Sequence, residues 1–323
     1  MQRLHANFAL PVNGKTKWNT TGTAAVESYG TPSAAVDFAV MCPGSKDWRE
    51  LLIQRLEYIA KAYQADSIFL DQVCGCWAYP CYSRDHNHAR PNESWSGYLL
   101  MLKEIRRRLR DINADFLLAT EGVCDILGQY FDVQQGHNDW DTQVGTKSLP
   151  MPELYSYTFP KHVVNTGFVS PNNYYYLKLA HAVGSGLDLC AIEPNRLEKR
   201  FLRYIEIIMQ WRKEYSDVLR GGEYLGTLPC DSSHYLAHAF EKGDSVIATC
   251  AWVPYKSDPQ KPERIRIILE RTKIRTVRLF TDDGEQSINI ETNGNESIID
   301  IPFNEIGLLE IKLSKLASDQ ETK

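Results

Sequence analysis

The sequence predicts an α/β fold: a partial TIM-type β/α barrel over residues 1–221, followed by a C-terminal antiparallel β-sandwich over residues 222–323. In the first part, short apolar runs alternate with amphipathic helical segments, which is typical of a mainly parallel sheet covered by helices. After Gly222, short strand-like segments follow one another without a long helix, separated by turn signals such as Asp283-Gly284. This second pattern is typical of an antiparallel sandwich.

The barrel-like part contains predicted strands that are short apolar runs, at residues 35–41, 67–73, 115–122, 153–159 and 187–194. Helices are predicted between them: one capped by Ser45, one with an apolar face from Trp95 to Leu109, one from near Asn172 to Gly184, and one over 196–219. A closed eight-stranded barrel usually needs about 250 residues. The barrel-like part is shorter than that, and residues 1–34 are expected to be irregular. We therefore expect the first strands of a complete barrel to be missing, although the sheet could instead stay open.

The sandwich-like part is expected to support the barrel rather than to bind sugar by itself, because its predicted strands carry no concentrated aromatic stripe. These strands cover residues 223–228, 234–241, 245–252, 264–270, 276–280 and 307–313.

Composition limits the kinds of partner. The 323 residues carry a net charge of −5, which argues against nucleic acid or an anionic membrane as the main partner. The sequence has no apolar stretch near the roughly 20 residues that span a bilayer, and its start does not read as a signal peptide. We therefore expect a cytoplasmic protein, in which the eight cysteines are reduced thiols.

Three predicted strands end in an acid: Asp71 in "FLDQ", Glu121 in "ATEG" and Glu193 in "AIEP". The carboxyl ends of parallel barrel strands meet at one rim, where barrel enzymes place their reacting groups. Asp71 and Glu121 are one βα unit apart, so they are expected to be neighbours. A pair of carboxylates is what glycosidic bond cleavage requires, although each acid could instead cap a helix or pair with an arginine.

The segment after Asp71 is rich in aromatic and polar residues that could bind a sugar. Aromatic rings there can stack on a pyranose ring while polar groups hydrogen-bond its hydroxyls, although an aromatic residue can also simply anchor a loop. With two residues from later loops and strand ends, the candidate substrate-binding residues are Trp77, Tyr79, Asp85, His86, His88, Trp95, His137 and Glu193.

The same loop contains potential zinc ligands: Cys74, Cys76, Cys81, His86 and His88. Paired zinc cysteines usually have two to four residues between them, whereas Cys74 and Cys76 have one. The sequence therefore favours a site without a metal or other cofactor.

Several segments resemble a known protein family. They are "VMCP" (40–43), "FLDQ" (69–72), "CYSRDHNH" (81–88), "ATEG" (119–122) and "PELYSYTFP" (152–160). Together they resemble a bacterial glycoside-hydrolase-like TIM-barrel family of unknown function, distantly similar to endo-α-N-acetylgalactosaminidase and α-amylase-type barrels. The resemblance covers about residues 36–220.

This resemblance implies a retaining glycosidase that acts on α-linked glycosides or oligosaccharides. It implies that Asp71 is the nucleophile and Glu121 the acid/base. Two other readings of the residues stay open: a non-catalytic or truncated carbohydrate-binding barrel, and a metal-dependent hydrolase or lyase that uses the carboxylates and histidines.

Overall fold

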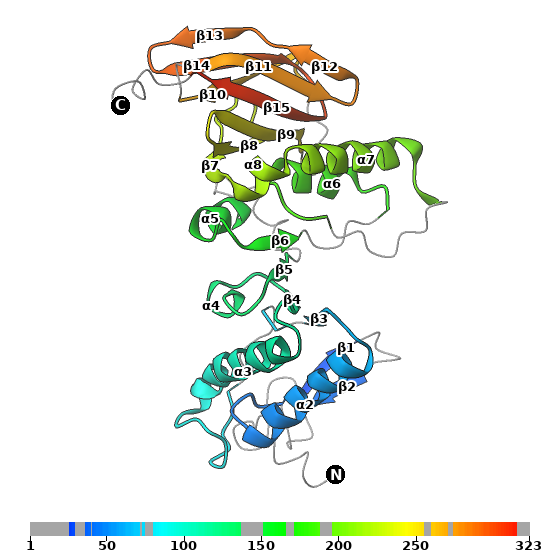
Figure 1. Ribbon diagram of the computed structural model, residues 1–323, viewed down its shortest axis with the longest axis vertical. Helices are drawn as coiled ribbons and strands as arrows, with labels where there is room; N and C mark the ends of the chain where they lie inside the picture. Colours follow the sequence, from blue (N-terminus) through cyan, green and yellow to red (C-terminus); the bar gives the residue numbers. More distant parts are fainter. Residues whose placement is uncertain are drawn as a thin grey trace, which may run out of the picture. The chain divides into compact units, whose positions relative to one another are not determined.

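The computed structural model describes residues 26–29, 36–39, 41–71, 73–74, 80–136, 151–165, 171–187, 196–254, 260–270 and 274–314. The chain divides into two compact units, Met1–Gln134 and Gln135–Lys323, which are blue to teal and green to red in Figure 1. The predicted end of the barrel-like part near residue 221 falls where helix α8 (Ser216–Gly221) gives way to strand β7 (Glu223–Thr227). Residues 135–221 belong to the second unit.

The first unit begins with an antiparallel pair, β1 (Val26–Tyr29) and β2 (Val36–Ala39). Two expectations were wrong here. Residues 1–34 were expected to be irregular, yet they contain β1, and the strand predicted at 35–41 was expected in a parallel sheet. The connection of six residues (36 − 29 − 1) is too short for a parallel crossover, which takes a dozen or more residues.

A parallel sheet follows, as the sequence predicts. Strand β3 (Ser67–Leu70) pairs in parallel with β4 (Leu117–Glu121), in a register that runs from Ser67 opposite Leu117 to Leu70 opposite Thr120. The short strand β5 (Val133–Gln135), which the sequence analysis missed, lies next to β4. Helix α2 (Lys46–Ala62) precedes β3, and η2 (Pro91–Trp95) and α3 (Ser96–Ile112) separate β3 from β4. The four-residue helix α4 (Asp125–Gly128) follows β4.

Helices α2 and α3 cover one face of this sheet. The predicted cap of α2 is confirmed, because the Ser45 side chain accepts a hydrogen bond from the N–H of Trp48 at 3.4 Å. Apolar residues spaced three and four apart on both helices pack with the inner face of β3 and β4. The fully or nearly fully buried members of this core include Ile53, Leu56, Leu102, Ile105, Leu109, Phe116 and Leu118.

The second unit is built on antiparallel sheets, as predicted for the C-terminal part. Among its described residues, one sheet has the order β12-β11-β15-β9-β8-β7 and another the order β10-β14-β13. The new strands are β8 (Tyr235–Lys242), β9 (Ser245–Trp252), β10 (Arg264–Leu269), β11 (Ile274–Thr281), β12 (Gly284–Ser287), β13 (Ile290–Asn293), β14 (Glu296–Pro302) and β15 (Ile306–Leu313). Their facing side chains share one core, which includes Val246, Ala248, Leu279, Ile265, Ile267, Ile299 and Ile301.

Helices cover the other face of the larger sheet in this unit. Alternate residues of β9 face opposite ways, so Val246 and Ala248 enter the core between the sheets while Ile247 and Ala251 pack under helices. These helices are α6 (Tyr174–Ala182), with its N-cap at Asn173, and α7 (Lys199–Glu214). Because β9 is buried on both faces, the helices before residue 221 and the antiparallel strands form one compact unit.

One predicted strand is a helix. Residues 153–159 were expected in a β-strand, but α5 covers Met151–Thr158. Pro152 stands in the first turn of α5, where proline is favoured. The Tyr155 and Phe159 rings, four residues apart, lie 4.9 Å from centroid to centroid, and the Phe159 N–H donates to the Tyr155 carbonyl. The aromatic spacing therefore reflects a helical pair. The short strand β6 (Val163–Asn165) follows, and Asn165 bridges to Gly186 in parallel.

A partly buried ion cluster joins α6 and α7 to Glu305, the residue directly before β15. Glu305 accepts from Lys261 at 2.8 Å and lies 3.4 Å from both Lys178 and Arg200. Burial by itself raises the pKa of Glu305, but the Lys261 hydrogen bond and the neighbouring positive charges lower it to about 2. The cluster keeps Lys178, which is almost fully buried, paired with a negative charge.

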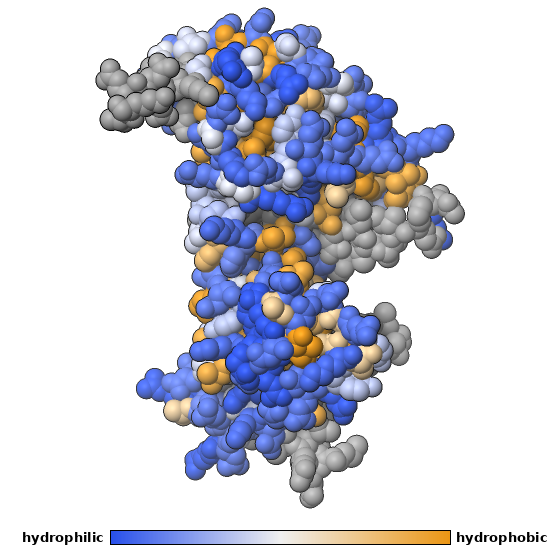
Figure 2. Space-filling model, in the orientation of Figure 1, coloured by the Kyte–Doolittle hydropathy of each residue, from blue (hydrophilic) through white to orange (hydrophobic). Residues whose placement is uncertain are grey.

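Polar residues cover most of the face drawn in Figure 2, with hydrophobic residues in small patches. Among the described helices, none combines the length and the hydropathy needed to cross a membrane.

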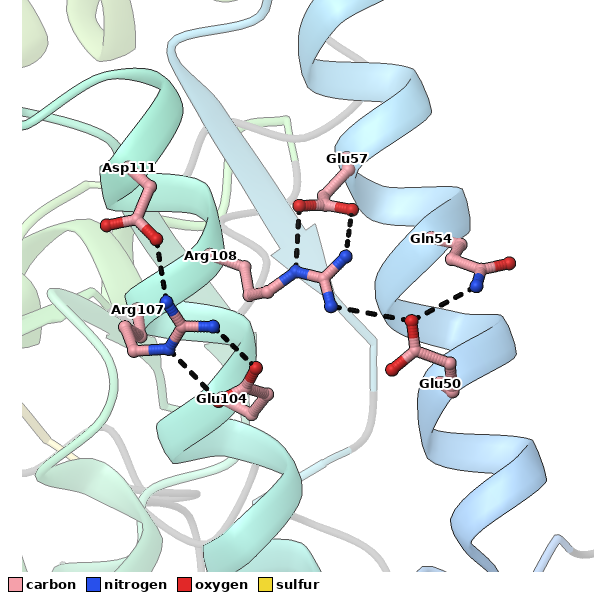
Figure 3. Close-up of polar contacts among 7 residues, drawn as sticks. All are labelled: Glu50, Gln54, Glu57, Glu104, Arg107, Arg108 and Asp111. Atoms are coloured by element: carbon pink, nitrogen blue, oxygen red, sulfur yellow. Dashed lines mark hydrogen bonds and ion pairs between the residues drawn. The ribbon is translucent and has the colours of Figure 1, made fainter.

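Charged residues also connect α2 with α3, as Figure 3 shows. The Arg108 guanidinium donates to both carboxylate oxygens of Glu57, at 2.9 and 2.5 Å, and lies 3.4 Å from Glu50. The two paired side chains are 25% and 18% exposed, whereas the Arg107–Glu104 pair within α3 is 57% and 41% exposed. The Arg108 hydrogen bonds lower the pKa of Glu57. The interhelical pair is therefore the one expected to stabilise the unit.

Replacing Glu57 by glutamine should lower the free energy of unfolding by about 1 kcal/mol at pH 7. Because the pKa of Glu57 is lowered in the folded protein, its contribution is complete above the ordinary glutamate pKa of about 4.3 and is lost as the pH falls through the folded value. Urea denaturation between pH 3 and pH 7 measures both effects. Glu104→Gln, a matched change at the exposed pair, should cost less than about 0.5 kcal/mol. Equal losses in the two variants would contradict the assignment.

Candidate functional site

The two predicted catalytic acids lie at the carboxyl ends of the paired strands β3 and β4. Asp71 comes directly after β3, and Glu121 is the last residue of β4. The register places Leu70 opposite Thr120, so the next residues along each strand are Asp71 and Glu121. The backbone supports this continuation, because the Cys74 N–H donates to the Glu121 carbonyl at 3.2 Å. The structure thus brings these two positions to the same end of neighbouring strands.

Each acid comes directly after a residue whose side chain faces the core under α2 and α3. Leu70 and Thr120 are buried, whereas Phe69 and Leu117 are 48% and 47% exposed on the other side of the strands. The alternation of side chains along β4 places Glu121 on the side of Leu117, away from α2 and α3, and Asp71 stands in the turn that directly follows β3. In a β/α barrel, the side away from the helices is the interior. Asp71 is exposed and Glu121 is half-buried.

The residues around Glu121 hold β4 in place. Gly122 has a φ of 86°, a left-handed conformation that favours glycine, so the chain can turn directly after the acid. Asp132 accepts a hydrogen bond from the Leu118 N–H at 2.9 Å and another from Arg106 at 2.8 Å. The Asp132 N–H in turn donates to the Leu118 carbonyl at 2.7 Å. Asp132 therefore ties β4 to α3 and to the start of β5.

Two cysteines, Cys74 and Cys124, follow the two acids in the sequence, each by three residues. Cys74 hydrogen-bonds to the sulfur of Cys124, which lowers the pKa of Cys124 to about 6. The N–H groups of Leu127 and Ile126 also lower this pKa, because Cys124 is the N-cap of α4. The pKa of the half-buried Cys74 is raised by its hydrogen bond to Cys124 and by partial burial. Cys124 is half-buried, and its lowered pKa makes it the more readily ionised thiol of the pair.

A second group of cysteines and histidines forms a compact cluster. Cys42, Cys81, His86 and His88 each offer one ligand atom, and these four atoms all lie within 4.8 Å of one another. The Cys42 sulfur is 3.6 Å from His88 Nε2, and the Cys81 sulfur is 3.3 Å from His86 Nδ1. The neighbouring Cys81 sulfur and burial raise the pKa of the Cys42 thiol. Neither cysteine is in a disulfide.

The other predicted substrate-binding residues are scattered or undescribed. Asp85 is exposed beside this cluster in the chain, with its N–H donating to the Ser83 hydroxyl at 3.3 Å. Trp95 packs against the core between α2 and α3. Four predicted site residues lie outside the described residues: Trp77, Tyr79, His137 and Glu193. The potential ligand Cys76 lies outside them too.

Sequence reasoning missed three residues that the structure brings to these sites. Cys124 and Asp132 gave no signal, because their partners Cys74 and Leu118 are distant in the sequence. Cys42 was not among the potential zinc ligands suggested by the sequence, because it lies about forty residues before Cys81.

The fold and the site define an α/β protein with acids at the carboxyl ends of neighbouring parallel strands and a second unit of antiparallel sheets. Residues 13–170 match the family model described as "Domain of unknown function (DUF6259)". A Bacteroides thetaiotaomicron protein named "Putative glycoside hydrolase" is 25% identical over 220 residues, 63% of this chain. The chain spans 31% of that relative's length. The resemblance predicted from the sequence motifs is confirmed.

Solved structures of an alpha-amylase and of a glucanotransferase share the fold over most of this chain. The noncanonic maltogenic alpha-amylase AmyB from Thermotoga neapolitana aligns with a TM-score of 0.58 at 12% identity, over 88% of this chain and 70% of its own. A cycloisomaltooligosaccharide glucanotransferase of Paenibacillus sp., complexed with cycloisomaltoheptaose, aligns with a TM-score of 0.63 at 9% identity, over 88% and 68%. At these identities the similarity concerns the fold. The described residues of this chain contain a parallel sheet but no closed barrel.

The thiol pair predicts a pH-dependent reactivity. Alkylation of Cys124 by iodoacetamide should be half-maximal near its lowered pKa of about 6, whereas an ordinary thiol has a pKa of about 8.5. Cys74→Ala removes the donor and should move the midpoint upward, while Cys74→Ser keeps a hydroxyl donor and should move it less. Peptide mass spectrometry follows Cys124 separately from the other cysteines. A midpoint near 8.5 in the unmodified protein would contradict the pairing.

Proposed function

We propose that this chain belongs to a protein that hydrolyses glycosidic bonds in α-linked oligosaccharides with retention of configuration. In this proposal Asp71 is the nucleophile, Glu121 is the general acid/base, and the parallel sheet of the first unit is part of a β/α barrel. The observation that supports the proposal is the parallel register, which ends with Leu70 opposite Thr120, the residues directly before Asp71 and Glu121. The similarity to the Bacteroides relative and to the amylase-type fold supports it.

The spacing of the strands favours retention. Neighbouring strands lie about 4.8 Å apart, so acids at matching positions on one side start from that separation. Retaining glycosidases hold their carboxyl groups about 5–5.5 Å apart, whereas inverting enzymes need about 6.5–9.5 Å to admit a water molecule. Two acids on adjacent strands in register suit the shorter distance.

The proposed reaction has two steps. A carboxylate oxygen of Asp71 attacks the anomeric carbon, and the bond to the leaving oxygen breaks as Glu121 gives that oxygen its proton. Glu121 then removes a proton from water, the water oxygen attacks the anomeric carbon, and the bond to Asp71 breaks. The exposed position of Asp71 suits a charged nucleophile, and the half-buried position of Glu121 suits a group that holds a proton.

The proposed substrate contacts come from the segment after β3. Trp77 and Tyr79 are proposed to stack on a sugar ring, with Asp85 hydrogen-bonding its hydroxyls, and His137 and Glu193 stay predictions for later strand ends. Trp95 is better explained as a residue of the α2–α3 core. His86 and His88 are left out of the proposed sugar contacts because they face the sulfur atoms of Cys81 and Cys42.

Substitution of either acid should abolish turnover of α-linked oligosaccharides and leave the fold intact. We expect Asp71→Asn to lower kcat by about 10⁴-fold or more, because it removes the nucleophile. Glu121→Gln should lower it by about 10²–10⁴-fold. Glu121→Gln should lose less on a dinitrophenyl glycoside, because that leaving group needs no proton. Reducing-sugar and chromogenic assays measure these rates.

The matched control is Asp66→Asn, the same change at the exposed residue before the amino end of β3. It should leave kcat within about twofold, because barrel active sites lie at the carboxyl end. Unchanged turnover in Asp71→Asn would remove the nucleophile assignment. Oligosaccharide binding by calorimetry without any turnover would favour the non-catalytic reading instead.

Product stereochemistry tests the mechanism independently of the substitutions. Proton NMR of the first product, recorded before mutarotation, should show the same anomeric configuration as the substrate. An inverted product would refute the nucleophilic role of Asp71 and would point to a water molecule between the two acids.

A further inference from the structure

We propose that Cys42, Cys81, His86 and His88 bind a zinc ion as a structural site. The four candidate ligand atoms converge within 4.8 Å of one another. They come from two separate segments of the first unit, the turn before α2 and the stretch that precedes η2. This site does not depend on the proposed glycosidase activity.

The distances fit a tetrahedral zinc ion. With a Zn–S distance of about 2.3 Å and a Zn–N distance of about 2.0–2.1 Å, sulfur and nitrogen ligands lie about 3.6 Å apart. Cys42 Sγ and His88 Nε2 are 3.6 Å apart, and Cys81 Sγ and His86 Nδ1 are 3.3 Å apart. Two isolated thiol–imidazole hydrogen bonds would explain each distance, but not why the two pairs lie together with all four ligand atoms within 4.8 Å of one another.

The backbone around the cluster lets its two ligand-bearing segments approach each other closely. A Cβ atom added to Gly44 would lie 2.7 Å from the His88 ring and 3.3 Å from the Cys42 sulfur, so only glycine fits there. The Asn87 N–H donates to the Gly44 carbonyl at 3.1 Å, which joins the two ligand-bearing segments. The Cys81 N–H donates to the Pro91 carbonyl at 2.9 Å. These contacts fix the ligand positions from outside the cluster.

The ligand set selects the metal and its role. Two thiolates and two imidazoles in a tetrahedron are typical of zinc. Four protein ligands leave no open position for water or substrate, which distinguishes a structural zinc site from a catalytic one. Burial agrees, since Cys42 and Cys81 are fully buried and His86 nearly so. Zinc would neutralise two thiolates that the surrounding core could not hold unpaired.

Elemental analysis of the full chain, purified with reductant and dialysed, tests the site. We expect about one zinc per chain in the unmodified protein and less than about a tenth of that in His88→Ala and Cys42→Ser. His88→Cys replaces one zinc ligand type by another and should retain zinc. Cys124→Ser is the matched control, because this half-buried thiol of the same unit lies outside the cluster, and it should retain the metal.

A second measurement covers variants that fold poorly. Replacing zinc by cobalt in the unmodified protein should give the visible bands of tetrahedral cobalt and a thiolate-to-cobalt charge-transfer band. A strong chelator should lower the unfolding temperature of the unmodified protein by several degrees and change that of His88→Ala little. Absence of metal, octahedral cobalt bands, zinc retained in both ligand variants, or a Cys42–Cys81 disulfide found by peptide mapping would each overturn the proposal.

Discussion

The parallel pairing of β3 with β4 is the constraint on which the candidate site depends. Its register brings Asp71 and Glu121 to the same strand ends, and its one-sided burial directs Glu121 away from the helix-covered face. A shift of one residue would send one acid toward the core of α2 and α3. The Asp132 hydrogen bonds to Leu118 and Arg106 hold this register from the opposite edge of β4.

The second unit depends on a strand that is buried on both of its faces. Strand β9 supplies Val246 to the core between the sheets and Ile247 to the core under α6 and α7. A strand buried twice cannot separate from either layer without exposing apolar surface, at about 25 cal/mol per Å². The Glu305 cluster adds charge pairing at the same junction. Residues 171–221 are thus physically part of the sandwich unit, although their sequence pattern resembles that of the barrel-like part.

Local patterns in the sequence predicted the elements well where one period dominates. The helices after Ser45 and Trp95, the parallel strands that lead to Asp71 and Glu121, and six of the antiparallel C-terminal strands followed from apolar spacing, whereas β12, β13 and β14 were missed. Residues 153–159 failed because aromatic residues at i and i+4 can be read as strand or helix until Pro152 is weighed. Contacts between distant segments, such as Cys42 with His88, depend on tertiary structure and leave little local signal.

The Cys–His cluster and the acids are linked through the chain itself. The backbone hydrogen bond to Glu121 holds the chain at Cys74, and the cluster holds it again at Cys81, which leaves six residues, 75–80, between two fixed points. Trp77 and Tyr79, the proposed sugar contacts, fall within those six. Fixing both ends of a short segment lowers the entropy that it loses when a ligand orders it. A structural metal at the cluster would therefore act on sugar binding by limiting where this segment can go, without touching the substrate.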